Sequence, residues 1–170
     1  MKSAFRWFAL LAPRVVFALM LLACLRAGAA ETTLAAAKDL AAEARMSAQK
    51  GMPLIVMVSL AGCPYCDVVR RSHLLPLLNS GSIGPTPEIR QVEINGSELM
   101  RDFSGMEITH QAFAQRYKVT IAPVVFFFDA RGELLTAPLV GAMIPDFYGG
   151  YFDAALKEAK NKVRDARVSP

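Results

Sequence analysis

The sequence predicts one α/β domain with a central mixed sheet, helices on both faces and an extra helix at its N-terminal end. Three observations predict this fold class. Apolar, β-rich runs alternate with helical patterns along the first part of the chain. A turn containing Asp and Gly joins two strand-like runs further on, as in an antiparallel hairpin. No repeat or linker divides the 170 residues, of which 54% are apolar and 20% charged.

The first predicted elements are a helix, a buried strand and a second helix. Residues 32–49 are rich in alanine at helical spacing, and one of the two threonines at the start is expected to cap this helix. Residues 53–60 (PLIVMVSL) are apolar almost throughout, as expected of a strand buried on both faces. The second helix spans residues 67–78 and is interrupted near Pro76, because proline lacks an amide proton.

Three more strands are predicted in the second half of the chain. Residues 89–94 alternate in polarity, and residues 124–128 (VVFFF) form an apolar strand whose phenylalanines belong to the core. Residues 129–132 (DARG) form a hairpin turn, with glycine placed for a positive φ. The returning strand covers residues 133–140 and is broken or at an edge at Pro138, since proline cannot donate to a neighbouring strand.

Two further helices and one irregular segment complete the expected element order. Residues 109–117 form a short amphipathic helix capped by Thr109. The last helix spans residues 145–164, and Gly149 and Gly150 weaken it, so it is expected to be kinked or to start late. Residues 95–107 are polar and are expected to be irregular.

The positive charge of the chain lies entirely in its first part. The formal net charge is +4, and four basic residues precede residue 30 while no acidic residue does. From residue 30 onward, 15 basic residues (19 − 4) face 15 acidic ones, so this part is neutral. A neutral body gives no electrostatic reason to bind a polyanion, and we therefore expect no nucleic-acid partner.

Residues 1–29 have the three parts of a secretory signal peptide. A basic start is followed by an apolar run over residues 15–25 and by the small residues Ala27, Gly28 and Ala29. The apolar run is shorter than the roughly 20 residues that cross a bilayer, which disfavours an uncleaved anchor. We therefore expect the mature domain to span residues 30–170 and to be exported, into the periplasm if the leader is bacterial.

A lipid anchor is the alternative reading of the leader. Residues 21–24 (LLAC) resemble a bacterial lipobox, in which the cysteine, here Cys24, is lipidated and becomes the N-terminus. Leu22 is not the usual residue at its position, and a site for full release lies a few residues further on. Release is favoured, and contact with the membrane is expected only if Cys24 is lipidated.

The remaining cysteines, Cys63 and Cys66, form a C-x-x-C motif directly after the first predicted strand. A bridge that closes such a short loop stabilises a fold far less than a long-range one, so a chemical role explains the pair better than a structural role. Pro64 suits the first position of a helix. The sulfur of Cys63 would then lie at a helix N-terminus, where the dipole and free amide protons lower its pKa below the free value of about 8.5.

This arrangement assigns different roles to the four residues of the motif. Cys63 is the attacking thiolate, and Cys66, one turn further into the helix, resolves the mixed disulfide. Pro64 and Tyr65 stiffen the turn and are expected to tune the reduction potential. This chemistry needs no cofactor. It also needs no metal, and a zinc site would need two more ligands, whereas His73 and His110 show no ligand spacing.

Residues 35–165 resemble the thioredoxin superfamily. The matching stretches are IVMVSLAGCPYC, KVTIAPVVFFFDARGE and LVGA, and the leader resembles that of periplasmic, SoxW-like members. The resemblance implies a thioredoxin-like fold in which Pro123 follows a cis peptide bond and lies against the cysteines. It also implies that Ala122 offers its backbone to an extended substrate strand.

The sequence departs from the superfamily pattern at two positions. Many thioredoxins carry a buried Asp six residues before the first cysteine, where this chain has Met57, so the group that takes the proton of Cys66 is not identified. Gly62 replaces the usual Trp before the first cysteine. Among the other polar residues, Asp67 is expected to suit the helix dipole, His73 to lie at the surface or behind the site, and His110 to be solvated.

These observations predict an exported thiol–disulfide oxidoreductase that reduces disulfides in partner proteins. The resemblance implies a membrane thiol transporter of the DsbD type as the electron donor. Two alternatives stay open: a disulfide oxidase or isomerase, and a binding module of the same fold whose disulfide is never cycled.

Overall fold

The computed structural model describes residues 33–142 and 145–168, which belong to a compact unit spanning Glu31–Pro170. The predicted signal peptide of residues 1–29, including Cys24, lies outside the described residues. Within the described residues, no helix is long and apolar enough to cross a membrane.

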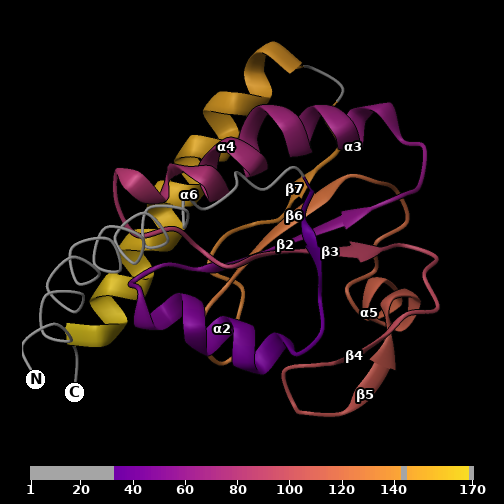
Figure 1. The fold of residues 1–170 in the computed structure, drawn as a ribbon, viewed down its shortest axis with the longest axis horizontal. Helices are drawn as coiled ribbons and strands as arrows, with labels where there is room; N and C mark the ends of the chain where they lie inside the picture. The colour runs from indigo at the N-terminus through magenta and orange to yellow at the C-terminus, as the bar shows by residue number, and fades with distance from the viewer. Residues whose placement is uncertain (1–32, 143–144, 169–170) are drawn as a thin grey trace, which may run out of the picture. The chain divides into compact units, whose positions relative to one another are not determined.

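The core of the fold is a mixed sheet of five strands (Figure 1). The strands are β1 (Ala35–Ala36), β2 (Leu54–Ser59), β3 (Ile89–Glu93), β6 (Val124–Phe128) and β7 (Leu139–Val140). Their order across the sheet is β1-β3-β2-β6-β7, so β2 lies at the centre. β2 is parallel to β3 and antiparallel to β6, while β1 joins in parallel at one edge and β7 antiparallel at the other. The predicted mixed sheet is thus confirmed.

Helices cover both faces of this sheet (Figure 1). One face is covered by α2 (Leu40–Gln49) and α5 (His110–Arg116). The other is covered by α3 (Pro64–Val69), the π-helix η1 (Arg70–Leu74), α4 (Leu75–Leu78) and α6 (Pro145–Val168). A 3-10 turn, η2 (Asn79–Ser82), follows α4. The predicted three-layer α/β fold is confirmed.

The central strands are buried because they supply both cores. Leu54, Val56 and Val58 of β2 pack toward α2 and α5, whereas Ile55 and Met57 pack toward α3 and α6. Every residue of β2 and of β6 is buried, as the continuous apolar runs predict. Burial on both faces explains why β2 shows no alternation of polarity in the sequence.

The first helix begins later than the alanine pattern predicts. Ala35 and Ala36 pair with β3, so the predicted helical start at residue 32 or 33 is wrong. Asp39 is the N-cap, and its carboxylate accepts a hydrogen bond from the Ala42 N–H at 2.8 Å. An aspartate side chain satisfies a free amide at a helix start, which outweighs the helical preference of the alanines before it.

A hairpin occupies most of the segment that was expected to be irregular. β4 (Leu99–Arg101) and β5 (Glu107–Thr109) pair as antiparallel strands. The turn between them is organised by Asp102, which is 1% exposed and pairs with Arg116 of α5 at 2.5 Å. Its carboxylate also accepts two backbone N–H groups of the turn, at 2.8 and 2.9 Å. One buried carboxylate therefore orders a segment whose composition is that of a loop.

Other predicted boundaries near the end of the chain are partly confirmed. Gly132 has a φ of +87°, and the turn at residues 129–132 forms as predicted. The prediction of a returning strand over residues 133–140 is wrong for most of that length. Only Leu139–Val140 forms β7, after a single bridge between Leu134 and Phe128. Pro138 has no N–H to donate, which is consistent with the short ladder.

The helix that follows the cysteine motif and the last helix are both close to their predicted positions. The predicted interruption near Pro76 is present as η1, in which the Leu75 N–H bonds to the Arg70 carbonyl, one residue beyond the α-helical partner. α6 begins at Pro145 and continues through Gly149 and Gly150, so the expected late start is not found, and the helix ends at Val168 instead of residue 164.

Candidate active site

Cys63 is the N-cap residue of α3. β2 ends at Ser59, and the chain turns at Gly62, which has a φ of +73° that an L side chain would resist. Cys63 is extended (φ −80°, ψ 111°), and Pro64 opens the helix. The Cys66 N–H donates to the sulfur of Cys63 at 3.1 Å. The sulfur thus accepts one of the amide protons that a helix start leaves free, as the motif predicts.

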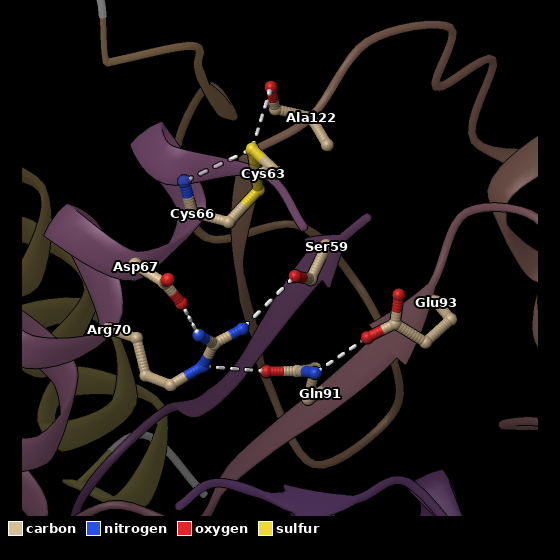
Figure 2. The surroundings of a disulfide bond; sticks show 8 residues. All are labelled: Ser59, Cys63, Cys66, Asp67, Arg70, Gln91, Glu93 and Ala122. Carbon is tan, nitrogen blue, oxygen red and sulfur yellow. Dashed lines mark hydrogen bonds and ion pairs between the residues drawn. A yellow bond between two sulfur atoms is a disulfide. The ribbon is translucent and has the colours of Figure 1, made fainter. Parts of the chain in front are cut away.

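The two cysteines form a disulfide bond (Figure 2). Their Cα atoms are 5.3 Å apart, within the usual range for a disulfide. Cys66 is fully buried in the core beneath α3, whereas Cys63 is partly exposed. Of the two cysteines, Cys63 is therefore the one at the surface that an incoming partner would contact.

Ala122 and Pro123 lie next to Cys63, although they are far from it in sequence. The Ala122–Pro123 peptide bond is cis, as the resemblance implies. The sulfur of Cys63 lies 3.9 Å from the carbonyl oxygen of Ala122 (Figure 2). The Pro123 carbonyl is held by the N–H of Gly141 at 2.8 Å, which fixes this loop to the end of β7.

An apolar groove adjoins this loop. It has a volume of about 280 Å³, and its walls include Ile121, Val140 and the first turns of α6. Phe147 and Tyr151 of α6 are both 66% exposed, and Ile121 and Val140 are 54% and 61% exposed. Large apolar side chains gathered at such exposure are typical of a surface that binds another chain. The sequence motifs did not identify Phe147 or Tyr151.

A polar network lies beneath α3, on the sheet side of the disulfide (Figure 2). Arg70 forms an ion pair with Asp67 and donates to Ser59 Oγ at 3.2 Å and to Gln91 Oε1 at 3.0 Å. The Gln91 amide donates in turn to Glu93 at 2.6 Å. Apart from Asp67, this network was missed in the sequence. The sequence feature that indicates this network is a set of polar residues at alternate positions near the ends of β2 and β3, on the face that α3 covers.

The two histidines behave differently from each other. His73 is partly buried against Tyr148 and Phe152, as expected of a residue behind the site. Burial lowers the pKa of His73, and the nearby carboxylate of Asp153 offsets part of this effect. His110 was expected to be solvated, which is wrong, because it is 1% exposed. Its Nδ1 accepts from the Glu93 N–H at 3.2 Å, so it joins α5 to β3.

No ionisable side chain occupies the position that many thioredoxins fill with an aspartate. Met57 lies there and is fully buried in the same core as Cys66. Tyr148 also lies in this core, and burial raises the pKa of its hydroxyl well above the ordinary value. At neutral pH neither Met57 nor Tyr148 carries a charge.

Residues 40–160 match the family described as a thioredoxin-like domain. Since the match covers more than half of the 170 residues, the chain belongs to the thioredoxin-like family. A search of curated proteins found no match. The fold and the close cysteine pair together define the general class, which is a thioredoxin-fold protein equipped for thiol–disulfide exchange.

Solved structures with a similar fold include thioredoxins and two Dsb proteins. Oxidised mitochondrial thioredoxin 3 from Saccharomyces cerevisiae is 16% identical, with a TM-score of 0.46 over 74% of this chain and 99% of its own. The DsbH oxidoreductase is 19% identical, with a TM-score of 0.47 over 74% and 86%. The oxidised C-terminal domain of Neisseria meningitidis DsbD is 16% identical, with a TM-score of 0.44 over 68% and 90%.

Proposed function

We propose that this protein is an exported, periplasmic thiol–disulfide oxidoreductase of the SoxW-like group that reduces disulfides in partner proteins. One observation carries the proposal. Cys63 is partly exposed, its sulfur accepts an amide proton at a helix start and lies 3.9 Å from the Ala122 carbonyl, and Cys66 is buried behind it. This geometry favours a thiolate at Cys63 in the reduced protein.

The proposed reaction has two exchange steps. The Cys63 thiolate attacks a sulfur of the substrate disulfide, and the other substrate sulfur leaves as a thiolate and is protonated by solvent. The thiolate of Cys66 then attacks Cys63. The bond between Cys63 and the substrate breaks, the second substrate sulfur leaves with the electron pair, and the Cys63–Cys66 disulfide forms. Two electrons pass to the substrate, which is released as a dithiol.

Ala122 and Pro123 are proposed to hold the substrate during these steps. The Ala122 carbonyl lies beside the reacting sulfur, and Ala122 is partly exposed. The groove lined by Ile121, Val140, Phe147 and Tyr151 continues from this loop and would bind apolar side chains next to the substrate cysteine.

The oxidised protein must be reduced again before another cycle. We propose a membrane thiol transporter of the DsbD type as the donor, in line with the predicted export of residues 30–170. If Cys24 is lipidated, the same enzyme would be anchored to the membrane, and the intact mass of the mature protein distinguishes the two forms.

The first test is reduction of insulin disulfides in the presence of a dithiol. Wild-type protein should accelerate the reaction, and Cys63→Ser should abolish the acceleration because the attacking sulfur is absent. Cys24→Ser is the matched control and should keep the full rate. Unchanged activity in the Cys63→Ser variant would disprove the proposal.

The direction of electron flow is tested by the reduction potential of the Cys63–Cys66 couple. A reductase should have a potential near that of thioredoxin, about −270 mV, whereas a value near −120 mV would assign the protein to the oxidases. A pair that stays oxidised in cells, even when the electron donor is active, would indicate a binding module with a static disulfide.

A further inference from the structure

The polar network beneath α3 lies next to the helix that carries Cys66, the residue that reacts in the second exchange step. In that step Cys66 must lose its proton although it is fully buried, and burial disfavours a thiolate. Met57 offers no proton acceptor at the position next to it in the core. A positive charge near Cys66 would favour its thiolate, and Arg70 is the first basic residue after Cys66 along the helix.

Arg70 places a cation on the same face of the helix as Cys66. The two residues are four apart, and the Arg70 N–H bonds to the Cys66 carbonyl, so they lie one helical turn from each other. Residues at this spacing have Cβ atoms about 5–6 Å apart. The Arg70 side chain is 18% exposed, and its guanidinium bonds to side chains of β2 and β3, so its charge is turned toward the sheet (Figure 2). Cys66 is fully buried in the core that α3 forms with the same sheet.

The network fixes the guanidinium in this place. Arginine only donates hydrogen bonds, so the Gln91 amide must turn its oxygen toward Arg70 and its NH₂ group toward Glu93. The second carboxylate oxygen of Glu93, Oε2, is buried and has no hydrogen-bond partner. Glu93 thus orients Gln91, Gln91 orients Arg70, and Ser59 holds the other end of the guanidinium.

Other charged or ionisable groups around Cys66 do not supply a positive charge. Asp67 and Glu93 are carboxylates that oppose a thiolate. The effect of the Asp67 carboxylate on the Cys66 thiol is weakened, because the Asp67 side chain is 49% exposed and paired with Arg70. His73 and Tyr148, on the α6 side, are uncharged at neutral pH, since burial lowers the pKa of His73 and raises that of Tyr148.

We propose that Arg70 is a positioning residue that promotes ionisation of Cys66. Its fixed positive charge would serve in place of a proton acceptor, which Met57 cannot provide. This inference rests on the proposed function, since it concerns the resolving step. The proton of Cys66 passes to water, the thiolate attacks Cys63, and the departing substrate sulfur takes up a proton, so the step needs no other reactant. Arg70 itself neither gains nor loses a proton.

The test measures the acid dissociation constant of the Cys66 thiol directly. The full chain carrying Cys24→Ser and Cys63→Ala has Cys66 as its only thiol, and the ultraviolet absorbance of the thiolate is titrated against pH. Adding Arg70→Met should lower the dissociation constant about tenfold, because a partly buried charge near a thiol acts at low effective dielectric. Arg70→Lys keeps the charge and should restore most of the loss.

A second variant changes the constant in the opposite direction. Asp67→Asn removes an opposing carboxylate from an exposed position and should raise the dissociation constant about threefold. Circular dichroism checks that each variant is folded. If Arg70→Lys lowers the constant as far as Arg70→Met does, or if Asp67→Asn lowers it, Arg70 acts only as a structural link and the proposal is overturned. No substrate is present in this titration, so failure of insulin reduction would overturn the proposed function without affecting this result.

Discussion

At the scale of single residues, the site depends on a difference between the surroundings of the Cys63 and Cys66 sulfur atoms. Cys63 is partly exposed and accepts the Cys66 N–H at 3.1 Å, while Cys66 is buried among core side chains. The amide protons at the start of α3 stabilise negative charge on Cys63, and burial disfavours it on Cys66. Each sulfur is therefore suited to one of the two exchange steps.

This difference in surroundings predicts how the alkylation rate of Cys63 depends on pH. With Cys24→Ser and Cys66→Ser in place, the reaction of iodoacetamide with the reduced protein should follow a pKa below about 7.5, because the helix start favours the thiolate. A thiol with a pKa at or above about 8.5 would show that the helix start has no effect.

Sequence patterns identify the atoms that react but not the ones that surround them. The C-P-Y-C motif places Cys63 at a helix start, and its resemblance to thioredoxins implies the cis bond before Pro123, which the structure contains. His110 and Arg70 are different. Their partners come from β3 and from other distant segments, so no local pattern shows that these polar residues are bound in the interior.

At the scale of secondary-structure elements, single polar groups decide boundaries that apolar patterns cannot. The strands β2 and β6 were predicted well because every residue in them is buried. The start of α2 was missed because Asp39 outweighs a run of alanines, and the β4–β5 hairpin was missed because it depends on Asp102. A helix or strand is easiest to predict when its stability comes from its own repeating pattern.

The Asp102 turn makes a testable contribution to stability. Burial alone would raise the pKa of this carboxyl, but hydrogen bonds from Arg116, Ser104 and Met106 lower it to about 2. A pKa below the unfolded value of about 3.9 means that the stabilisation is present above that pH and is lost as the pH falls toward 2. Asp102→Asn should lower the free energy of unfolding at neutral pH by about 2 kcal/mol.

Urea denaturation between neutral pH and acid pH measures this effect. In the Asp102→Asn variant the loss of stability on acidification should be smaller by a similar amount. The control, Asp165→Asn, removes a carboxylate that is 73% exposed, and it should change stability by less than about 0.5 kcal/mol. An Asp102→Asn variant as stable as wild type would contradict this account of the turn.

The adjacent glycines of α6 provide a second pair of matched variants. A Cβ at Gly150 would meet no atom within 4 Å, so Gly150→Ala should raise the free energy of unfolding by about 0.5–1 kcal/mol. A Cβ at Gly149 would lie 3.3 Å from the His73 ring, so Gly149→Ala should give a smaller gain or none. Thermal unfolding ranks the two variants, and a larger gain at Gly149 would contradict the packing of His73 against α6.

At the scale of the whole molecule, the sheet brings together segments that are far apart in sequence. β2 leads into the cysteine motif, the loop before β6 supplies Ala122 and Pro123, and β7 leads toward the exposed aromatic residues of α6. The neighbouring positions of β2, β6 and β7 in the sheet place all three beside one another. The fold predicted from the sequence implies that the cysteines lie beside Pro123. It does not indicate that Phe147 and Tyr151 extend the same surface.

This extended surface predicts a difference between large and small substrates. Replacing both Phe147 and Tyr151 by serine should lower kcat/KM for a protein disulfide about tenfold, since each loses an apolar contact. The rate with a small aromatic disulfide should be unchanged, because it needs only the sulfur of Cys63. Ile83→Ser is the control, as Ile83 is 89% exposed and does not line this groove. Equal losses for both substrates would show that the aromatic residues do not bind the substrate chain.

The most direct test of the account is the capture of a mixed disulfide with a protein that carries a single disulfide bond. The Cys66→Ser variant should trap this protein in a covalent complex joined through Cys63, because the attacking sulfur is present and the resolving sulfur is absent. The Cys63→Ser variant should trap none. Capture through Cys66 in the Cys63→Ser variant, with none through Cys63 in the other, would contradict the roles that the structure supports for the two sulfurs.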